Sequence, residues 1–278
     1  MTMPENTEEW VLTKAHGRVL EIILNRPPAN AINRAMSRAI YAALRELQDN
    51  PDYSVGIIRG TGERIFCAGW DLKETAGEGG IDLELENDPV HGHGPGGFAG
   101  ITEFHDLTKP VIAAVNGAAV GGGFEIVLAC DIVLMADHAF FSLPEMQRGI
   151  LPDGGAVQKL PRMIPPNVAK ELFLTGRVMD AEEATRWGLA HKAVPVAELE
   201  TEAMTLAQEV AQGAPLALQA LKEVLSYMDG LTVKQSMAQV KPGGDCDCPI
   251  YQKMVSSEDA VEGITAFAEK RDPVWKGE

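Results

Sequence analysis

The apolar positions of the amino-terminal two thirds of the chain alternate between short runs and helical spacing. Residues 19–24, 55–58, 111–115 and 132–135 are runs of strand length, and the last two are apolar throughout. Between the first two runs, apolar side chains recur every three or four residues, which is the spacing of one helix face; these are Ile32, Met36, Ile40, Leu44 and Leu47. We therefore expect an α/β fold with a helix that begins after the turn at Pro27 and Pro28, and strands that are buried on both sides.

The pattern changes beyond about residue 196. Residues 199–212, 215–227 and 257–270 have helical spacing, and no strand pattern lies among them. We expect a core over residues 1–196 and a helical region over 197–278. Within the core, residues 77–100 are rich in glycine, histidine and acidic side chains and have no periodicity, which is typical of a mobile or functional loop.

Charge and composition exclude several classes of partner. The 278 residues carry a net charge of −16, which repels phosphate backbones and anionic lipid surfaces, and no basic patch offsets it. The longest uncharged run, 110–124, is too short for a membrane-spanning helix, and the acidic amino terminus has no apolar core of a secretory signal. We expect a cytoplasmic protein that binds neither nucleic acid nor membranes.

The cysteines do not indicate a disulfide framework or a metal centre. Four cysteines in a chain of this length are too few and too scattered for a disulfide scaffold. Cys246 and Cys248 lack the spacing of a zinc half-site, so we expect no bound metal. Cys67 has no visible base beside it and is expected to pack in the core. His91 and His93 flank a glycine-rich turn, where solvent exposure is the usual state.

The glycines at 121–123 stand directly before a helical pattern. Unhindered amides at a helix amino terminus can bind negative charge, such as the oxyanion that forms when a thioester is enolised. The alternative is that these glycines only permit close helix packing. The sequence alone leaves both interpretations open.

Two glutamates lie in apolar surroundings near these glycines. Glu125 is the only polar residue of the run FEIVLAC, and Glu145 follows FFSLP. Burial raises the pKa of an unpaired carboxyl group, which prepares it to exchange protons near neutral pH. The pair could divide the roles of general acid and general base, although helix capping or ion pairing is the alternative for each.

Several motifs in order resemble the crotonase (enoyl-CoA hydratase/isomerase) superfamily. FCAGWDL at 66–72 resembles the family signature F-[SC]-A-G-x-D-L, and NGAAVGGGFE at 116–125 resembles N-G-x-x-x-G-G-G-x-E. The PE pair at 144–145 and GILPDGG at 149–155 resemble the elements that follow. The resemblance extends from about residue 10 to the carboxyl terminus.

The resemblance implies a fold, a substrate and a set of site residues. The fold is the crotonase (ClpP/crotonase) spiral of ββα repeats followed by a helical region that forms homotrimers or dimers of trimers. The substrate is an acyl-CoA thioester, so coenzyme A belongs to the substrate and no separate cofactor is expected. By motif, the amides of Trp70 and Gly122 form the oxyanion hole, Glu125 and Glu145 are catalytic, and Ala68 and Gly121 contact the substrate. Members that have both glutamates hydrate a double bond.

The runs AGWDLK and GGFAGITE and the ending EDAVEGITAFAEKRDPVWKG resemble one branch of the family more closely. This branch implies a hydro-lyase whose substrate carries a quaternary ammonium near the reacting carbons. Such a cation favours aromatic faces, and Trp70 is a candidate, with core packing as its alternative. The acidic loop residues Glu84, Glu86 and Asp88 could attract the cation or only be solvated.

Two other classes of function remain open at this stage. One is a generic short-chain enoyl-CoA hydratase or enoyl-CoA isomerase, because fold and oxyanion hole do not select the acyl group. The other is a relative that binds RNA, or coenzyme A without turnover. The negative charge argues against RNA, and both glutamates argue against inertness.

Overall fold

The computed structural model describes residues 10–86, 88 and 90–278. Residues 1–9, in which we expect no secretory signal, lie outside this range. In the described part of the chain, no helix has the length and apolar character needed to cross a membrane.

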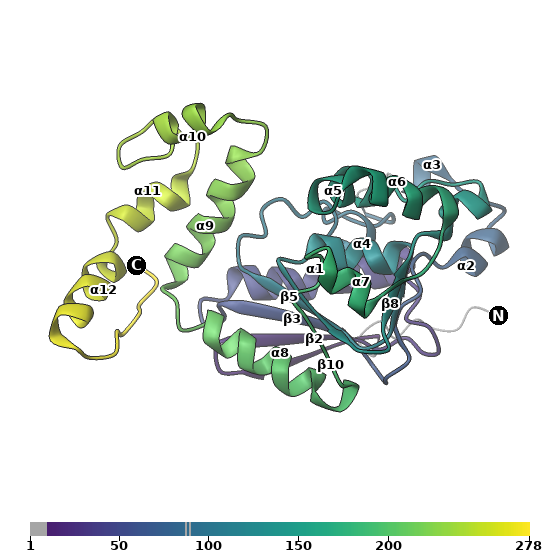
Figure 1. Cartoon of the computed structure of the whole chain (residues 1–278), viewed down its shortest axis with the longest axis horizontal. Coiled ribbons are helices and arrows are strands. Elements are labelled where there is room, and N and C mark those ends of the chain that lie inside the picture. The colour runs from purple at the N-terminus through teal and green to yellow at the C-terminus, as the bar shows by residue number, and fades with distance from the viewer. Residues whose placement is uncertain (1–9, 87, 89) are drawn as a thin grey trace.

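The described strands form two sheets (Figure 1). The larger has the order β1-β2-β3-β5-β7-β10, and only β1 runs antiparallel to its neighbour. Its strands are β1 (Val11–His16), β2 (Val19–Leu24), β3 (Val55–Gly60), β5 (Val111–Val115), β7 (Ile132–Ala136) and β10 (Lys192–Val194). The smaller sheet has the order β4-β6-β8-β9, with β4 (Ile65–Cys67), β6 (Ala118–Val120), β8 (Phe140–Ser142) and β9 (Met179–Asp180).

Successive strands alternate between the two sheets, and this makes the chain a spiral. β3, β5 and β7 belong to the larger sheet, while the strands that follow each of them, β4, β6 and β8, belong to the smaller. A helix follows each pair: α2 (Leu72–Gly77), α4 (Gly122–Ala129), or α5 (Ala156–Met163) after the 3₁₀ turn η3 (Pro144–Arg148). The predicted α/β spiral of ββα repeats is confirmed. Because β4 and β6 are parallel neighbours, the segments that leave them emerge at the same edge.

The core consists of the predicted apolar runs. β2 and β5 are buried along their whole length, and α1 (Arg34–Asp49) packs on the larger sheet at β2 and β3, with Met36, Ile40 and Leu44 on its buried face. Ile32, predicted as part of this helix, lies before it. The helix begins later because Asn33 caps it by accepting the Met36 N–H at 2.9 Å, while Ile32 pairs with Trp70 of another segment.

The loop over 77–100 contains short ordered pieces. These are α3 (Leu83–Glu86) and the 3₁₀ turn η2 (Phe98–Gly100). Arg34 at the start of α1 forms ion pairs with Glu78 at 2.6 Å and Glu86 at 2.8 Å, and Arg38 donates to the carbonyls of His91 and Gly92. The segment is therefore attached to the exposed side of α1.

The carboxyl-terminal residues are helical. α8 (Val196–Val210) packs on the larger sheet through Leu199, Ala203 and Ala207. The later helices extend from one side of the spiral (Figure 1): α9 (Pro215–Met228), α10 (Val233–Gln239), α11 (Pro249–Val255) and α12 (Glu258–Glu269). α10 and α11 were not predicted, because each is too short to show a helical repeat of apolar residues in the sequence. The domain division at residue 196 stays a prediction.

Candidate active site

Two glycine-containing segments, one after β4 and one after β6, meet at the edge of the smaller sheet. A Cβ atom on Gly69 would lie 2.8 Å from the Gly122 nitrogen, and Gly69 has a φ of +85°. A side chain at position 69 would thus be both obstructed and strained. The two segments can approach this closely only because glycine occupies position 69, and this places the amides of Trp70 and Gly122 next to each other in the fold.

The Trp70 amide is oriented by pairing with Ile32. The Ile32 N–H donates to the Gly69 carbonyl at 2.8 Å, and the Asp71 N–H donates to the Ile32 carbonyl at 2.9 Å. Peptide groups along an extended segment point to alternate sides, so the Trp70 N–H points away from Ile32. Among the described residues, the Trp70 N–H has no hydrogen-bond acceptor.

The Gly122 amide is free for a different reason. Gly122 is the first residue of α4, where an N–H has no partner within the helix. It has no acceptor elsewhere among the described residues, whereas the neighbouring Gly121 N–H is occupied by the Ser142 carbonyl at 2.9 Å. Trp70 and Gly122 therefore present two neighbouring amides with unused donor capacity, which is the composition of an oxyanion hole.

An ion pair between two residues that are far apart in the sequence fixes the loop that carries Trp70. Arg26 donates to Asp71 at 2.6 Å and to the Ala31 carbonyl at 2.8 Å. Burial alone would raise the pKa of Asp71, but the hydrogen bonds from Arg26 and from the Glu74 N–H outweigh it and hold that pKa below its usual value. The charged pair ties the residues around Ile32 to the residues around Trp70, and sequence analysis did not identify it.

Glu145 lies beside these amides with an unsatisfied oxygen. The residue belongs to η3, only 7% of it is exposed, and its Oε2 has no hydrogen-bond partner among the described residues. A Cβ on Gly121 would collide with Glu145 Oε1, so the carboxyl group packs against the backbone of the glycine run. Burial raises the pKa of Glu145, although Arg148 opposes this.

Glu125 projects from the first turn of α4 and is 5% exposed. Its Oε1 accepts the Ala156 N–H at 3.1 Å, and a Cβ on Gly154 would lie 2.7 Å from its Oε2. Burial raises the pKa of Glu125 to about 7, and the charges of Glu145 and Asp153 add to this effect. The run GILPDGG thus supplies the space and the amide that hold this carboxyl group.

The two carboxyl groups, both with raised pKa values, lie beside two free amide donors. Glu145 raises the pKa of Glu125 through its charge, so the two groups interact electrostatically. Paired carboxyls with raised pKa values can pass a proton to and from neighbouring atoms, while the amides stabilise negative charge on oxygen. The geometry suits acid–base chemistry next to a carbonyl group.

The other predicted residues lie in varied settings. Ala68 is exposed on the same loop as Trp70. The Trp70 side chain is half-buried and lines a shallow cleft with residues of α1 and α2, so it is not a core residue. Cys67 is fully buried, as expected, and burial raises the pKa of its thiol to about 12.

Two of the three acidic loop residues already have ion-pair or hydrogen-bond partners within the protein. Glu86 is paired with Arg34 and His93, and Asp88 accepts the N–H groups of Val90 and His91, while Glu84 is exposed. No group of three or more histidine, cysteine or acidic side chains in the described residues is arranged to hold a metal ion.

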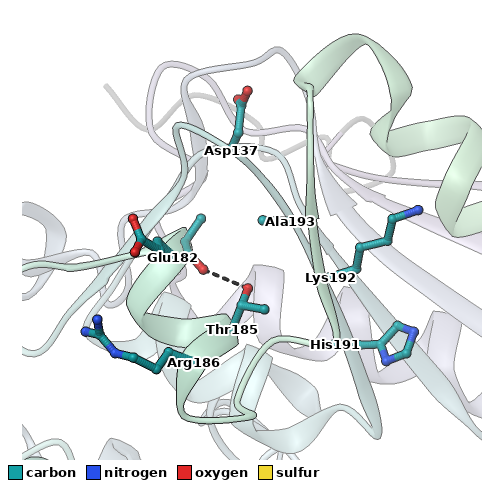
Figure 2. A pocket seen from close by; sticks show the side chains of 8 residues that line it. Asp137, Glu182, Thr185, Arg186, His191, Lys192 and Ala193 are labelled. Carbon is teal, nitrogen blue, oxygen red and sulfur yellow. Dashed lines mark hydrogen bonds between the residues drawn. The ribbon is translucent and has the colours of Figure 1, made fainter.

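A separate hollow lies over α7 (Ala181–Arg186) and β10 (Figure 2). Figure 2 shows that the charged ends of Arg186 and Lys192 point in opposite directions, and Lys192 is paired with Glu202 at 2.8 Å. These side chains do not converge on a common ligand position. The paired glutamates and free amides, which come from other elements, are therefore the candidate active site.

Comparison with known proteins identifies the class to which this fold and site belong. The sequence model of the enoyl-CoA hydratase/isomerase family matches residues 14–278. The chain belongs to this family, which is also called the crotonase superfamily, and it is an enzyme, a hydro-lyase of acyl-CoA thioesters.

Particular relatives narrow the comparison. The chain is 48% identical to a carnitinyl-CoA dehydratase of Citrobacter koseri, over 94% of this chain and 96% of that protein. It is also 48% identical to one of Proteus mirabilis, with the same coverage. The crystal structure of an enoyl-CoA hydratase from Mycobacterium tuberculosis H37Rv superposes with a TM-score of 0.84 at 36% identity, covering 98% of this chain and all of that one.

Proposed function

We propose that the enzyme reversibly dehydrates carnitinyl-CoA to crotonobetainyl-CoA. The observation that carries the proposal is the arrangement of Glu125 and Glu145, both buried, beside the unpartnered amides of Trp70 and Gly122. The relatives named carnitinyl-CoA dehydratase support the choice of acyl group.

In the proposed mechanism the thioester oxygen accepts hydrogen bonds from the Trp70 and Gly122 amides. Glu145 removes the proton from the α-carbon, and the electron pair moves onto the thioester oxygen as an enolate. Glu125 then gives its proton to the β-hydroxyl group, which leaves as water as the double bond forms. In hydration Glu125 takes a proton from water and Glu145 returns one to the α-carbon.

This mechanism predicts the same bell-shaped pH profile in both directions. Dehydration needs a protonated Glu125 and an ionised Glu145, and hydration needs the reverse. Both directions therefore require the form of the enzyme in which the two glutamates share one proton. Because the pKa of Glu125 is about 7, the last proton leaves above that pH, and kcat/KM should fall about tenfold per pH unit there. On the acid side of the profile, a second proton leaves neither glutamate able to accept a proton, so the rate falls there as well. Initial rates in both directions from about pH 5 to 9 would measure this, and a profile without an alkaline fall would contradict it.

The substrate is tested by comparing crotonobetainyl-CoA with crotonyl-CoA. Loss of the conjugated double bond is followed by ultraviolet absorbance. We expect kcat/KM to favour the cationic substrate about tenfold or more, which corresponds to about 1.4 kcal/mol of transition-state binding. Preference for crotonyl-CoA would indicate a generic hydratase, double-bond migration in a 3-enoyl-CoA an isomerase, and binding without turnover an inert relative.

We also propose a homotrimer or a pair of trimers. Large apolar side chains are exposed on the outer helices, including Leu221 on α9 and Ile264 and Phe267 on α12, the last two being 74% and 86% exposed. A second copy of the chain is the proposed cover for these faces. A cytoplasmic location and the absence of a separate cofactor belong to the same proposal.

A further inference from the structure

The ring of Phe98 packs directly on Gly122, one of the two residues whose amides form the candidate oxyanion hole. A Cβ atom on Gly122 would lie 2.4 Å from Cε1 and 2.5 Å from Cζ of Phe98, so glycine at position 122 allows the ring to pack this closely. Phe98 is half-buried and opens η2, which also contacts α4. The ring therefore belongs to the wall around the proposed thioester oxygen; Phe98 lies in the run GGFAGITE, but the resemblance of that run gave Phe98 no role.

The backbone around Phe98 is fixed to α1. The Ala99 N–H donates to Ser37 Oγ at 2.9 Å, and Thr102 Oγ1 donates to the Phe98 carbonyl at 3.0 Å. Gly97 and Gly100, on either side, have φ values of +68° and +66°, which form the tight turn that presents the ring. The position of Phe98 is thus set by a rigid element of the core.

His93 supports the ring from one side. The two ring centroids are 5.3 Å apart, and the rings are inclined at 57°. His93 lies within hydrogen-bond distance of Ser37 Oγ at 2.7 Å and of Glu86 at 2.9 Å. The expectation that both loop histidines are exposed is wrong for His93, whose side chain is only 11% exposed. It is buried because its partners belong to α1 and α3, which the sequence does not place together.

The order serine, histidine, glutamate resembles a hydrolase triad, but Ser37 cannot act as a nucleophile. The residue has no exposed surface, and its hydroxyl oxygen accepts the Ala99 N–H. The chain of groups therefore positions Phe98. Burial lowers the pKa of His93 despite the opposing charge of Glu86.

We propose that Phe98 determines specificity by offering its ring to the quaternary ammonium of the substrate; this inference rests on the proposed function. The ammonium lies one carbon beyond the β-carbon, so anchoring the thioester oxygen at Gly122 places the cation near a ring packed on that glycine. Aromatic faces attract such cations within about 6 Å of the ring centre. Glu86, the acidic side chain beside this wall, is already paired with Arg34 and His93.

The test separates charge from shape in both the protein and the substrate. The substrates are crotonobetainyl-CoA and its neutral analogue, in which a tert-butyl group replaces the trimethylammonium group. The variants are Phe98→Leu and the protein with trifluorinated phenylalanine at position 98, which keeps the ring shape but weakens its attraction for cations. We expect each to lower kcat/KM for the cationic substrate roughly 5- to 30-fold more than for the neutral analogue.

Equal losses on both substrates, or no loss with the fluorinated ring, would overturn the role of Phe98 while leaving the proposed function intact. Failure of the unmodified enzyme to turn over crotonobetainyl-CoA would instead overturn the proposed function and the inference with it. The fluorinated protein keeps the test decisive if Phe98→Leu does not fold.

Discussion

Replacing Glu125 with glutamine is expected to lower kcat by about 10²- to 10⁴-fold in both directions, the range for loss of one general acid–base group. Glutamine has nearly the shape of glutamate and can still accept the Ala156 N–H, but it has no proton to exchange at neutral pH. Glu145→Gln should have a loss of the same order. Because Trp70 and Gly122 remain in place, KM should change much less than kcat.

Isotope exchange distinguishes the two roles. If Glu145 removes the α-proton, Glu145→Gln should stop deuterium exchange from solvent into the α-position of carnitinyl-CoA. Glu125→Gln should retain part of that exchange because enolate formation does not require Glu125. Glu198→Gln, which removes an exposed carboxylate on α8, is the matched control and should keep the normal rate. Turnover within about threefold of normal in either active-site variant would refute the acid–base assignment.

The second large effect is expected from removing a single amide hydrogen. Gly122 is the first residue of α4, a position at which proline is well tolerated in helices. Gly122→Pro therefore removes an oxyanion donor while preserving the helix start. Both variants are made together with Phe98→Ala, which removes the ring that a Cβ at position 122 would meet, and Gly122→Ala in that background is the matched control because it adds the same Cβ but keeps the N–H.

We expect Gly122→Pro to have a kcat about 10²- to 10³-fold below that of Gly122→Ala, the usual effect of losing one oxyanion-hole donor. Steady-state kinetics on both variants measure this ratio, and circular dichroism with thermal unfolding checks that both remain folded. Equal activity in the proline and alanine variants would mean that the Gly122 amide does not bind the developing charge.

Much of the core could be predicted from the sequence because local patterns define it. The run at 111–115 became β5, and the spacing of Met36, Ile40 and Leu44 defined the buried face of α1. Glu125 also stood out, because a lone carboxylate in an apolar run must be buried or functional. These features depend on residues within a few positions of one another.

The parts of the site that depend on distant contacts could not be predicted in the same way. Arg26 and Asp71 are 45 residues apart, and Ser37 and His93 are 56 apart, so no local pattern connects them. The proximity of Trp70 and Gly122 came from family resemblance and not from spacing. Phe98 lies in the run GGFAGITE, which resembles one branch of the family, but a resemblance in sequence does not show that the ring packs on Gly122.

Because strands alternate between the two sheets, the amides at the ends of β4 and β6 lie together although a long stretch of chain connects these two strands. Trp70 and Gly122 are held at one edge by parallel β4 and β6, whereas the chain between those strands makes a long excursion that includes α2, α3 and η2. Changes at those positions of the excursion that contact neither Trp70 nor Gly122 can alter the surroundings of the site without displacing the two amides. New substrate ranges can thus evolve through such changes on an unchanged catalytic frame.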